Sequence, residues 1–357
     1  MTSRVAIGGE FELAPTDFAP GPDGVAPPRF GRRVSTACNT GRGALRLVLR
    51  DWLGRGGSGL VWLPDYICPS IPSACLAEGC CIEYYADLPD AHHLAQPPAP
   101  KKNDAVMFAH YFGFVNRKFM AWLEQIPSNR DWTLIEDCVQ AAYSDGVGIC
   151  GDYAILSLRK WWPLPDGAAF VTDQPPRVDL PESNEVFVSM RATAKLLRGC
   201  GRPADEFLAL VEQSEALLDA IPPCKMSWLS TRLLSHCDAA AMAVARRGNW
   251  RQLADAMPPG SPLAGKLTPL FPALQPNEVP LSFPVRVHDG RRDTLRAWLR
   301  EQSIYCPVHW AVQPGPGITA HALTLAQAVL SLPIDQRYAA QDMERLVAAL
   351  AGFFEHA

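Results

Sequence analysis

Two charged residues, an acid and an amine, stand at the ends of two apolar runs near the middle of the chain. The run "TLIED" ends at Asp137, and "AILSLRK" reaches Lys160, 23 positions further on. In an open parallel sheet, the carboxyl ends of the strands meet at one edge, and ligands bind beyond that edge. We therefore expect a carboxylate and a nucleophilic amine to lie close together.

A helix start supplies a third group of the kind that binds a ligand. In "STACNTGRGALRLVLRDWLG", Asn39 or Thr40 is the expected N-cap, apolar residues follow at helical spacing, and Gly54 marks the end. Gly41 and Arg42 then occupy the first turn, where backbone N–H groups have no partner inside the helix. Such a helix start binds anions, phosphate above all.

Together these groups are what a pyridoxal phosphate (PLP) site requires. A lysine amine forms a Schiff base with the cofactor's aldehyde, and a carboxylate keeps the pyridine nitrogen protonated. Ser157, three residues before Lys160, could add a hydroxyl to the phosphate site. Each part also has an ordinary reading: Lys160 as a solvated surface residue, Asp137 as a cap or loop acid, the "GRG" turn as a plain helix start. The order of the parts along the chain favours the cofactor site.

Short apolar strands alternate with helices in the first half of the chain. This pattern predicts an α/β fold with a mainly parallel sheet covered by helices on both faces. The expected strands are residues 59–66, 81–87, 104–114, 132–137, 152–158 and 168–173. After about residue 185 helical patterns dominate, one of them over 231–257, and a smaller α+β unit follows.

The length of 357 residues favours more than one domain. We predict a Pro- and Gly-rich N-terminal arm at 1–30, a large cofactor-binding domain at 31–235, and a small C-terminal α+β domain at 236–357. The boundary is expected inside the long helical pattern, near residues 230–245.

Composition excludes several classes of protein. A net charge of −4 gives no general attraction to nucleic acid. The chain shows no signal peptide and no run of 18 apolar residues, so we expect no membrane span. The 11 cysteines form no CxxC pair, which argues against zinc and disulfides and for a reduced, cytoplasmic protein. His92 and His93 alone cluster, in a polar proline-rich segment, so no metal is expected.

From about residue 34 to its end, the chain resembles the DegT/StrS family of sugar aminotransferases. "TGRGALRLVL" is similar to that family's "SGTAAL" helix start, and "WLPDYICPSIPSAC" to its "P-x-x-T-x-x-x-T" segment. "LIEDCVQAAYSD" is similar to "IEDAAQAHGA", and "GDYAILSLRK" to "GDIGCFSFHxxK". No single motif is unique to the family, but their common order is specific.

The resemblance implies a type I PLP fold and an aminotransferase. It would move an amino group from an amino-acid donor, such as glutamate, to a keto-sugar, typically nucleotide-linked, in polysaccharide or antibiotic-sugar synthesis. Lys160 would be the Schiff-base lysine and the proton shuttle. Asp137 would face the pyridine nitrogen, and Gln140 would lie against the ring or near its 3′ oxygen.

The resemblance further implies that Ser157 and the backbone of Gly41 and Arg42 contact the phosphate. Members of the family work as homodimers with sites at the subunit interface, so a homodimer is expected here. His309 and His110 could reach a substrate, although a satisfied, partly buried histidine is the simpler reading.

Four departures from the family bear on the substrate. Arg42 replaces the usual threonine, and the interval between Ser157 and Lys160 is shorter than usual. "WWPLPDG" replaces the glycine-rich stretch after the lysine, and its tryptophans are expected to pack in the core, in an interface or at the substrate mouth. Cys68 stands where an aromatic residue usually covers the ring, unless Tyr66 takes that role. Two alternatives therefore stay open: a PLP-dependent lyase or dehydratase, and a catalytically silent homologue with a binding or regulatory role.

Overall fold

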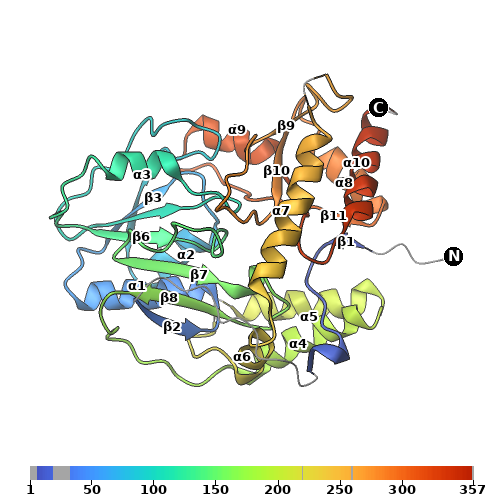
Figure 1. Cartoon of the computed structure of the whole chain (residues 1–357). Helices are drawn as coiled ribbons and strands as arrows, with labels where there is room; N and C mark the ends of the chain where they lie inside the picture. Colours follow the sequence, from blue (N-terminus) through green and yellow to red (C-terminus); the bar gives the residue numbers. More distant parts are fainter. Residues whose placement is uncertain (1–5, 19–32, 219, 259, 356–357) are drawn as a thin grey trace.

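A seven-stranded sheet forms the centre of the larger part of the molecule (Figure 1). The computed structural model describes residues 6–18, 33–218, 220–258 and 260–355. The order β2-β8-β7-β6-β5-β3-β4 is parallel except for β8, which pairs antiparallel with both of its neighbours. The strands are β2 (Val34–Cys38), β3 (Leu60–Pro64), β4 (Cys81–Tyr85), β5 (Ala105–Ala109), β6 (Thr133–Asp137), β7 (Tyr153–Ser157) and β8 (Ala168–Thr172). The predicted α/β fold with a mainly parallel sheet is confirmed.

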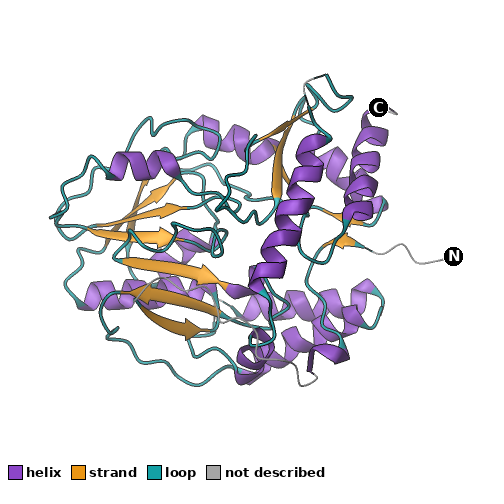
Figure 2. Cartoon of the chain, viewed as in Figure 1, coloured by secondary structure: helices purple, strands orange, loops and turns teal. Residues whose placement is uncertain are grey.

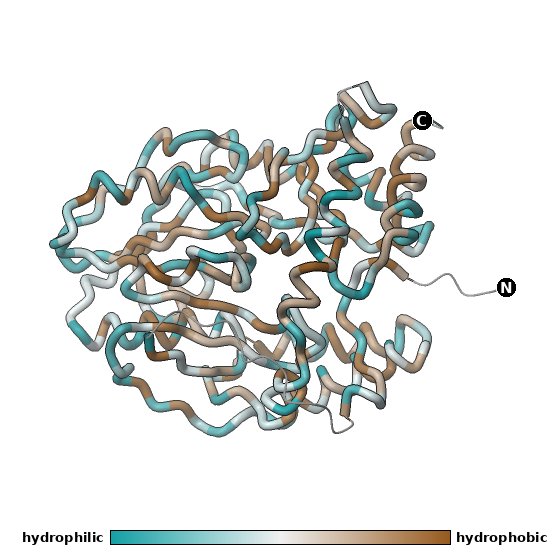
Figure 3. The backbone as a smooth tube through the Cα atoms, in the orientation of Figure 1, coloured by the Kyte–Doolittle hydropathy of each residue, from teal (hydrophilic) through white to brown (hydrophobic). Residues whose placement is uncertain are grey.

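Helices lie on both faces of this sheet (Figure 2). Its strands are largely hydrophobic (Figure 3), and β5, β7 and β8 are buried along their whole length, as a sheet covered on both sides requires. In β5, Met107 belongs to the core under α1 (Gly41–Gly54) and α2 (Ser70–Ala77). Its neighbour Phe108 packs on the opposite face with Phe119 of α3 (Arg117–Leu123). Side chains alternate along a strand, so neighbouring residues at one strand end face different surroundings.

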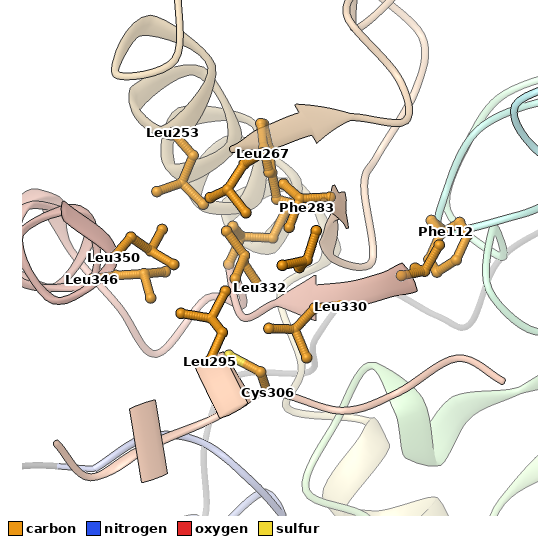
Figure 4. Close-up of a cluster of buried hydrophobic side chains, with 14 of the residues drawn as sticks. Phe112, Leu253, Leu267, Phe283, Leu295, Cys306, Leu330, Leu332, Leu346 and Leu350 are labelled. Carbon is orange, nitrogen blue, oxygen red and sulfur yellow. The ribbon is translucent and has the colours of Figure 1, made fainter. Parts of the chain in front are cut away.

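A second, antiparallel sheet of three strands, in the order β12-β10-β9, lies apart from the first. Figure 4 shows its core, where leucines of the strands and of the surrounding helices interdigitate with Phe283. The elements of this part are β9 (Leu267–Pro269), β10 (Phe283–Val287), α8 (Arg292–Glu301), β11 (Ile304–Tyr305), α9 (Ala320–Ala328), β12 (Val329–Leu332) and α10 (Ala340–Glu355).

The described part of the N-terminal arm packs against both parts of the molecule, more closely than its Pro- and Gly-rich sequence predicted. β1 (Ile7–Gly8) pairs in parallel with β11, and a single 3-10 turn follows at Pro15–Phe18. Leu13 is fully buried. The greater part of the predicted arm lies outside the described residues.

The single helical pattern predicted over 231–257 is wrong, because the structure breaks it. α6 (Trp228–Leu234) ends before α7 (Ala239–Asp255) begins. Asp238 accepts hydrogen bonds from the amides of Ala240 and Ala241, so it caps a new helix start. Upstream, α4 (Glu185–Gly199) and α5 (Ala204–Leu217) pack against each other. Among the described residues, no helix is both long and apolar enough to cross a membrane.

Candidate functional site

The carboxyl ends of β6 and β7 bring the predicted acid and amine to one edge of the sheet. β6 pairs in parallel with β7, with Asp137 opposite Ile155. Lys160 ends the short 3-10 turn Leu158–Lys160, which follows β7 directly. A strand that ends in a tight turn returns the chain to the sheet edge, so the lysine remains near the end of the neighbouring strand.

The charge of Lys160 affects the pKa values of both Asp137 and His309, so Lys160 lies close to both residues. Burial raises the pKa of Asp137 above its usual value, whereas the Val139 amide, 2.9 Å from Oδ1, and the Lys160 ammonium act in the opposite direction. Burial, and then the charge of Lys160, lower the pKa of His309 to about 3, so its imidazole is neutral at neutral pH. Within the described chain, Lys160 itself makes no hydrogen bond or ion pair.

The start of α1 lies against the end of β7. A Cβ atom placed on Gly41 would be 3.3 Å from the Cβ of Ser157 and 3.5 Å from Val139 Cγ2. Thr40 is the N-cap and accepts from the Gly43 amide, as predicted. The Gly41 amide and the Ser157 hydroxyl have no hydrogen-bond partner among the described residues. Two donors therefore remain available where the sequence predicts a phosphate.

Gln140 carries the clearest sign of a missing partner. Its Oε1 accepts from the Phe112 amide at 2.9 Å, but its Nε2 is buried without an acceptor in the described structure. Leaving a buried donor unpaired costs about 1–3 kcal/mol, so such a group fits a ligand acceptor. The residues around Asp137 thus suit PLP: a carboxylate for the ring nitrogen, an amide for a ring oxygen and free donors for the phosphate.

The position that usually carries a ring-covering aromatic has no free aromatic side chain. Cys68 lies there, with its Sγ 3.1 Å from Ser70 Oγ. Tyr66 is fully buried, donates its hydroxyl to the carbonyl of His309, and packs at a tilt against Trp310. Tyr66 follows β3 of the large sheet, but its side chain packs in the core of the small sheet. It therefore links the two parts of the molecule.

A buried network occupies the other face of β6. His110, Glu136 and Cys138 lie close enough to hold a metal ion. However, His110 Nδ1 accepts from the Asn116 amide, so the proton is assigned to Nε2, which donates to Glu136 at 2.8 Å. The carboxylate also accepts from the amide of Cys150. Burial raises the pKa of Glu136, but the hydrogen bonds that the carboxylate accepts, above all the one from His110 and including one from the Cys150 thiol, outweigh burial and lower the pKa to about 2. The cluster is a satisfied internal network rather than a set of free metal ligands.

Trp161, which the sequence left as a packing residue, links Lys160 to both parts of the molecule. Its indole Nε1 donates to the Val139 carbonyl at 3.2 Å, and the Val139 amide in turn donates to Asp137. Its own carbonyl accepts from Gln336 at 2.6 Å, and Gln336 accepts from Arg246 at 3.0 Å. The only sequence signal for this link was the replacement of the glycine-rich loop by "WWPLPDG".

A cavity of about 580 Å³ opens next to Lys160. The residues that line it come from β1, α4, α5, α7 and the small-sheet region. Figure 1 labels these elements. Of the predicted site residues, only Lys160 lines this cavity; Gly41, Arg42, Asp137, Gln140 and Ser157 do not. His309 lines it as well. Lys160 therefore stands between the cavity and the group of polar residues around Asp137.

Comparisons with known proteins give structural neighbours but no close relative. The sequence matches no protein-family model and no curated protein. A Streptococcus pneumoniae protein assigned as a sugar aminotransferase, in its PLP form, superposes with a TM-score of 0.64 at 13% identity and covers 99% of each chain. DesV from S. venezuelae, solved with a ketimine intermediate, gives 0.57 at 22% identity over 90% of this chain and 85% of that one.

A third neighbour carries the family name itself. The DegT DnrJ EryC1 StrS aminotransferase from Brucella abortus gives a TM-score of 0.58 at 16% identity, over 90% of this chain and 86% of that one. At these identities the likeness establishes the fold, which is that of type I aminotransferases, as the sequence predicted.

Proposed function

We propose that this protein is a PLP-dependent aminotransferase that moves an amino group from an amino-acid donor to a keto-sugar, nucleotide-linked as in the family it resembles. The observation that carries the proposal is the meeting of Asp137 and Lys160 at one sheet edge. The unpaired donors of Gln140, Ser157 and Gly41 surround that edge. The solved neighbours named as aminotransferases support the same reaction.

The residues divide the work according to their surroundings. When bound, PLP would supply a ring that accepts the electrons of a substrate carbanion. Asp137 would hold the ring nitrogen in its protonated form, because a carboxylate beside a cationic nitrogen stabilises the charge. Gln140 Nε2 would donate to a ring oxygen. Ser157 and the first turn of α1, Gly41 and Arg42, would hold the phosphate.

Lys160 would attach the cofactor and then move the proton at the substrate's Cα. An amine without a hydrogen-bond partner of its own is free to do both. His309, uncharged at neutral pH, lies beside it and would not compete for that proton. The Trp161 indole would keep the Lys160 turn in register with the Asp137 turn.

We also propose a homodimer that works in a reducing, cytoplasmic setting. Trp228 of α6 and Val244 of α7 are 78% and 73% exposed, which favours burial against a second copy. All 11 cysteines are free thiols, which supports a reducing compartment. Light scattering of the purified protein, with Trp228→Glu as the variant, tests the dimer; an unchanged particle size would count against this interface.

Absorption spectroscopy tests the central proposal. PLP added to the purified protein should give a near-visible band. Sodium borohydride should bleach this band and leave the cofactor covalently attached, and Lys160→Ala should abolish both the band and the attachment. Lys266→Ala, at an exposed lysine outside the cavity, is the matched control and should change neither. Added glutamate should convert the band in a single turnover, which separates aminotransfer from a lyase or dehydratase and from a silent homologue. A lack of any band with excess PLP would refute the proposal.

A further inference from the structure

Arg246 is a buried cation that forms no ion pair with a carboxylate of the described residues. Its side chain comes from α7 and is 1% exposed. Nε donates to Gln336 at 3.0 Å and Nη1 to the Leu281 carbonyl at 2.8 Å. Nη2 makes no hydrogen bond within the described chain, and no carboxylate there forms an ion pair with this guanidinium. A buried charge without a counter-ion is costly, which predicts an anionic partner from outside the chain.

Ser282 offers a second free group on the same cavity wall. It is 5% exposed, and its Oγ is buried without a partner in the described structure. It follows Leu281, whose carbonyl Arg246 holds, so the hydroxyl and the guanidinium belong to one local unit. Arg246, Ser282 and Lys160 all line the cavity of about 580 Å³.

The cavity as a whole carries an excess of positive charge. Each acid that lines it is held by a cation, in the pairs Glu10–Lys195, Glu215–Arg191 and Asp335–Arg337. Lys160, Arg246 and Arg296 also line it, and none of the three has a carboxylate partner among the described residues. The charge of Asp335 acts on Arg246, but this carboxylate accepts two hydrogen bonds from the side chain of Arg337.

We infer that Arg246 and Ser282 form a carboxylate-binding subsite within reach of the chemistry at Lys160. Nη2 of a guanidinium and a neighbouring hydroxyl present two donors, which suits the two oxygens of one carboxylate. A cavity of this size holds a small molecule. The ligand would be an amino acid or its 2-oxo acid, whose carboxylate binds here while its amino or keto group faces Lys160. That orientation rests on the proposed function; the anion site itself does not.

Calorimetric titration with glutarate tests the subsite in the absence and presence of PLP. Glutarate should bind, whereas its neutral diamide should not. Ser282→Ala should weaken glutarate binding roughly tenfold or more, because a hydrogen bond to a charged group is lost. The melting temperature of that variant should stay the same or rise, because its hydroxyl has no partner in the protein. Ser261→Ala, another buried hydroxyl without a partner, lies outside the cavity and should not change binding.

The other outcomes overturn the inference. Arg246→Lys would also test the site, but a change at this buried residue can prevent folding. Ser282→Ala decides independently of it: a glutarate affinity unchanged by Ser282→Ala would exclude this site. Inorganic phosphate that binds more tightly than glutarate, with the same dependence on Ser282, would exclude a carboxylate subsite. A PLP band without saturable glutarate binding would refute this inference and leave the proposed function intact. Glutarate binding that depends on Ser282, without any PLP band, would support the carboxylate subsite and refute the proposed function.

Discussion

Glu136 offers the sharpest test of how the sheet edge is built, because its carboxylate has only donors around it. Oε1 accepts from His110 Nε2 and from the Gly148 amide, and Oε2 accepts from the amides of Cys150 and Gly151. In Glu136→Gln, the new NH₂ group would face an N–H donor in either orientation. His110 cannot adapt by changing its tautomer, since its Nδ1 already accepts from a backbone amide.

The pKa of Glu136 sets the size and the pH range of the effect. Its carboxyl has a pKa of about 2 in the folded protein, against 4.5 normally. A depressed folded pKa contributes stability that is present above about pH 4.5 and is lost as the pH falls toward 2. Each pKa unit corresponds to about 1.4 kcal/mol, so the carboxylate contributes about 3 kcal/mol near neutral pH. The side chain is fully buried, so solvent screening does not reduce this value.

Urea unfolding of the wild type and Glu136→Gln at pH 7, 5 and 3 measures the contribution. We expect a difference in unfolding free energy of about 3 kcal/mol at pH 7 that largely persists at pH 5 and shrinks at pH 3, where the carboxyl is protonated in the unfolded chain but still ionised in the folded protein. Glu212→Gln, on the exposed side of α5, should show no such difference. A difference that stays constant down to pH 3, or one below about 1 kcal/mol at pH 7, would refute the reasoning.

Three further substitutions test other parts of the site. Asp137→Ala should weaken PLP binding roughly tenfold or more in a spectral titration, because a charge-assisted bond to the ring is lost. Trp161→Phe removes the bond to the Val139 carbonyl and should cost about 1 kcal/mol in urea unfolding. It should also shift the pH at which the PLP band titrates, which a purely structural loss would not do. Thr40→Ala removes the cap bond to Gly43 and should cost about 1 kcal/mol in urea unfolding.

Each of these three has a result that contradicts it. Unchanged PLP affinity in Asp137→Ala would place the cofactor elsewhere. Trp161→Phe with lower stability but an unaltered titration of the PLP band would reduce Trp161 to a core residue. Thr40→Ser, which keeps the hydroxyl, is the control for Thr40→Ala. An equal loss of unfolding free energy in both variants would show that the cap hydrogen bond does not stabilise the helix.

The sequence by itself determined most of the strands and helices along the chain and the two charged groups at the sheet edge, but it missed β2 and merged α6 with α7. An apolar run such as residues 105–109 is buried on both faces, so its composition marks it as a strand of a sheet that helices cover on both sides. The cap at Thr40 was equally readable, because it depends on residues within one turn of each other. Local patterns of this kind need no information about the rest of the chain.

Only the tertiary structure decided which groups face each other across distant segments. Glu136 and Asp137 are neighbours in sequence, yet the alternation of β6 sends one into a sealed network and the other to the site edge. Hydrogen bonds join Trp161 to Val139 and to Gln336, which lies 175 positions further along the chain. Likewise, only the folded chain shows that no described carboxylate forms an ion pair with Arg246. No sequence period encodes such contacts, because they arise from how two sheets and their helices pack in space.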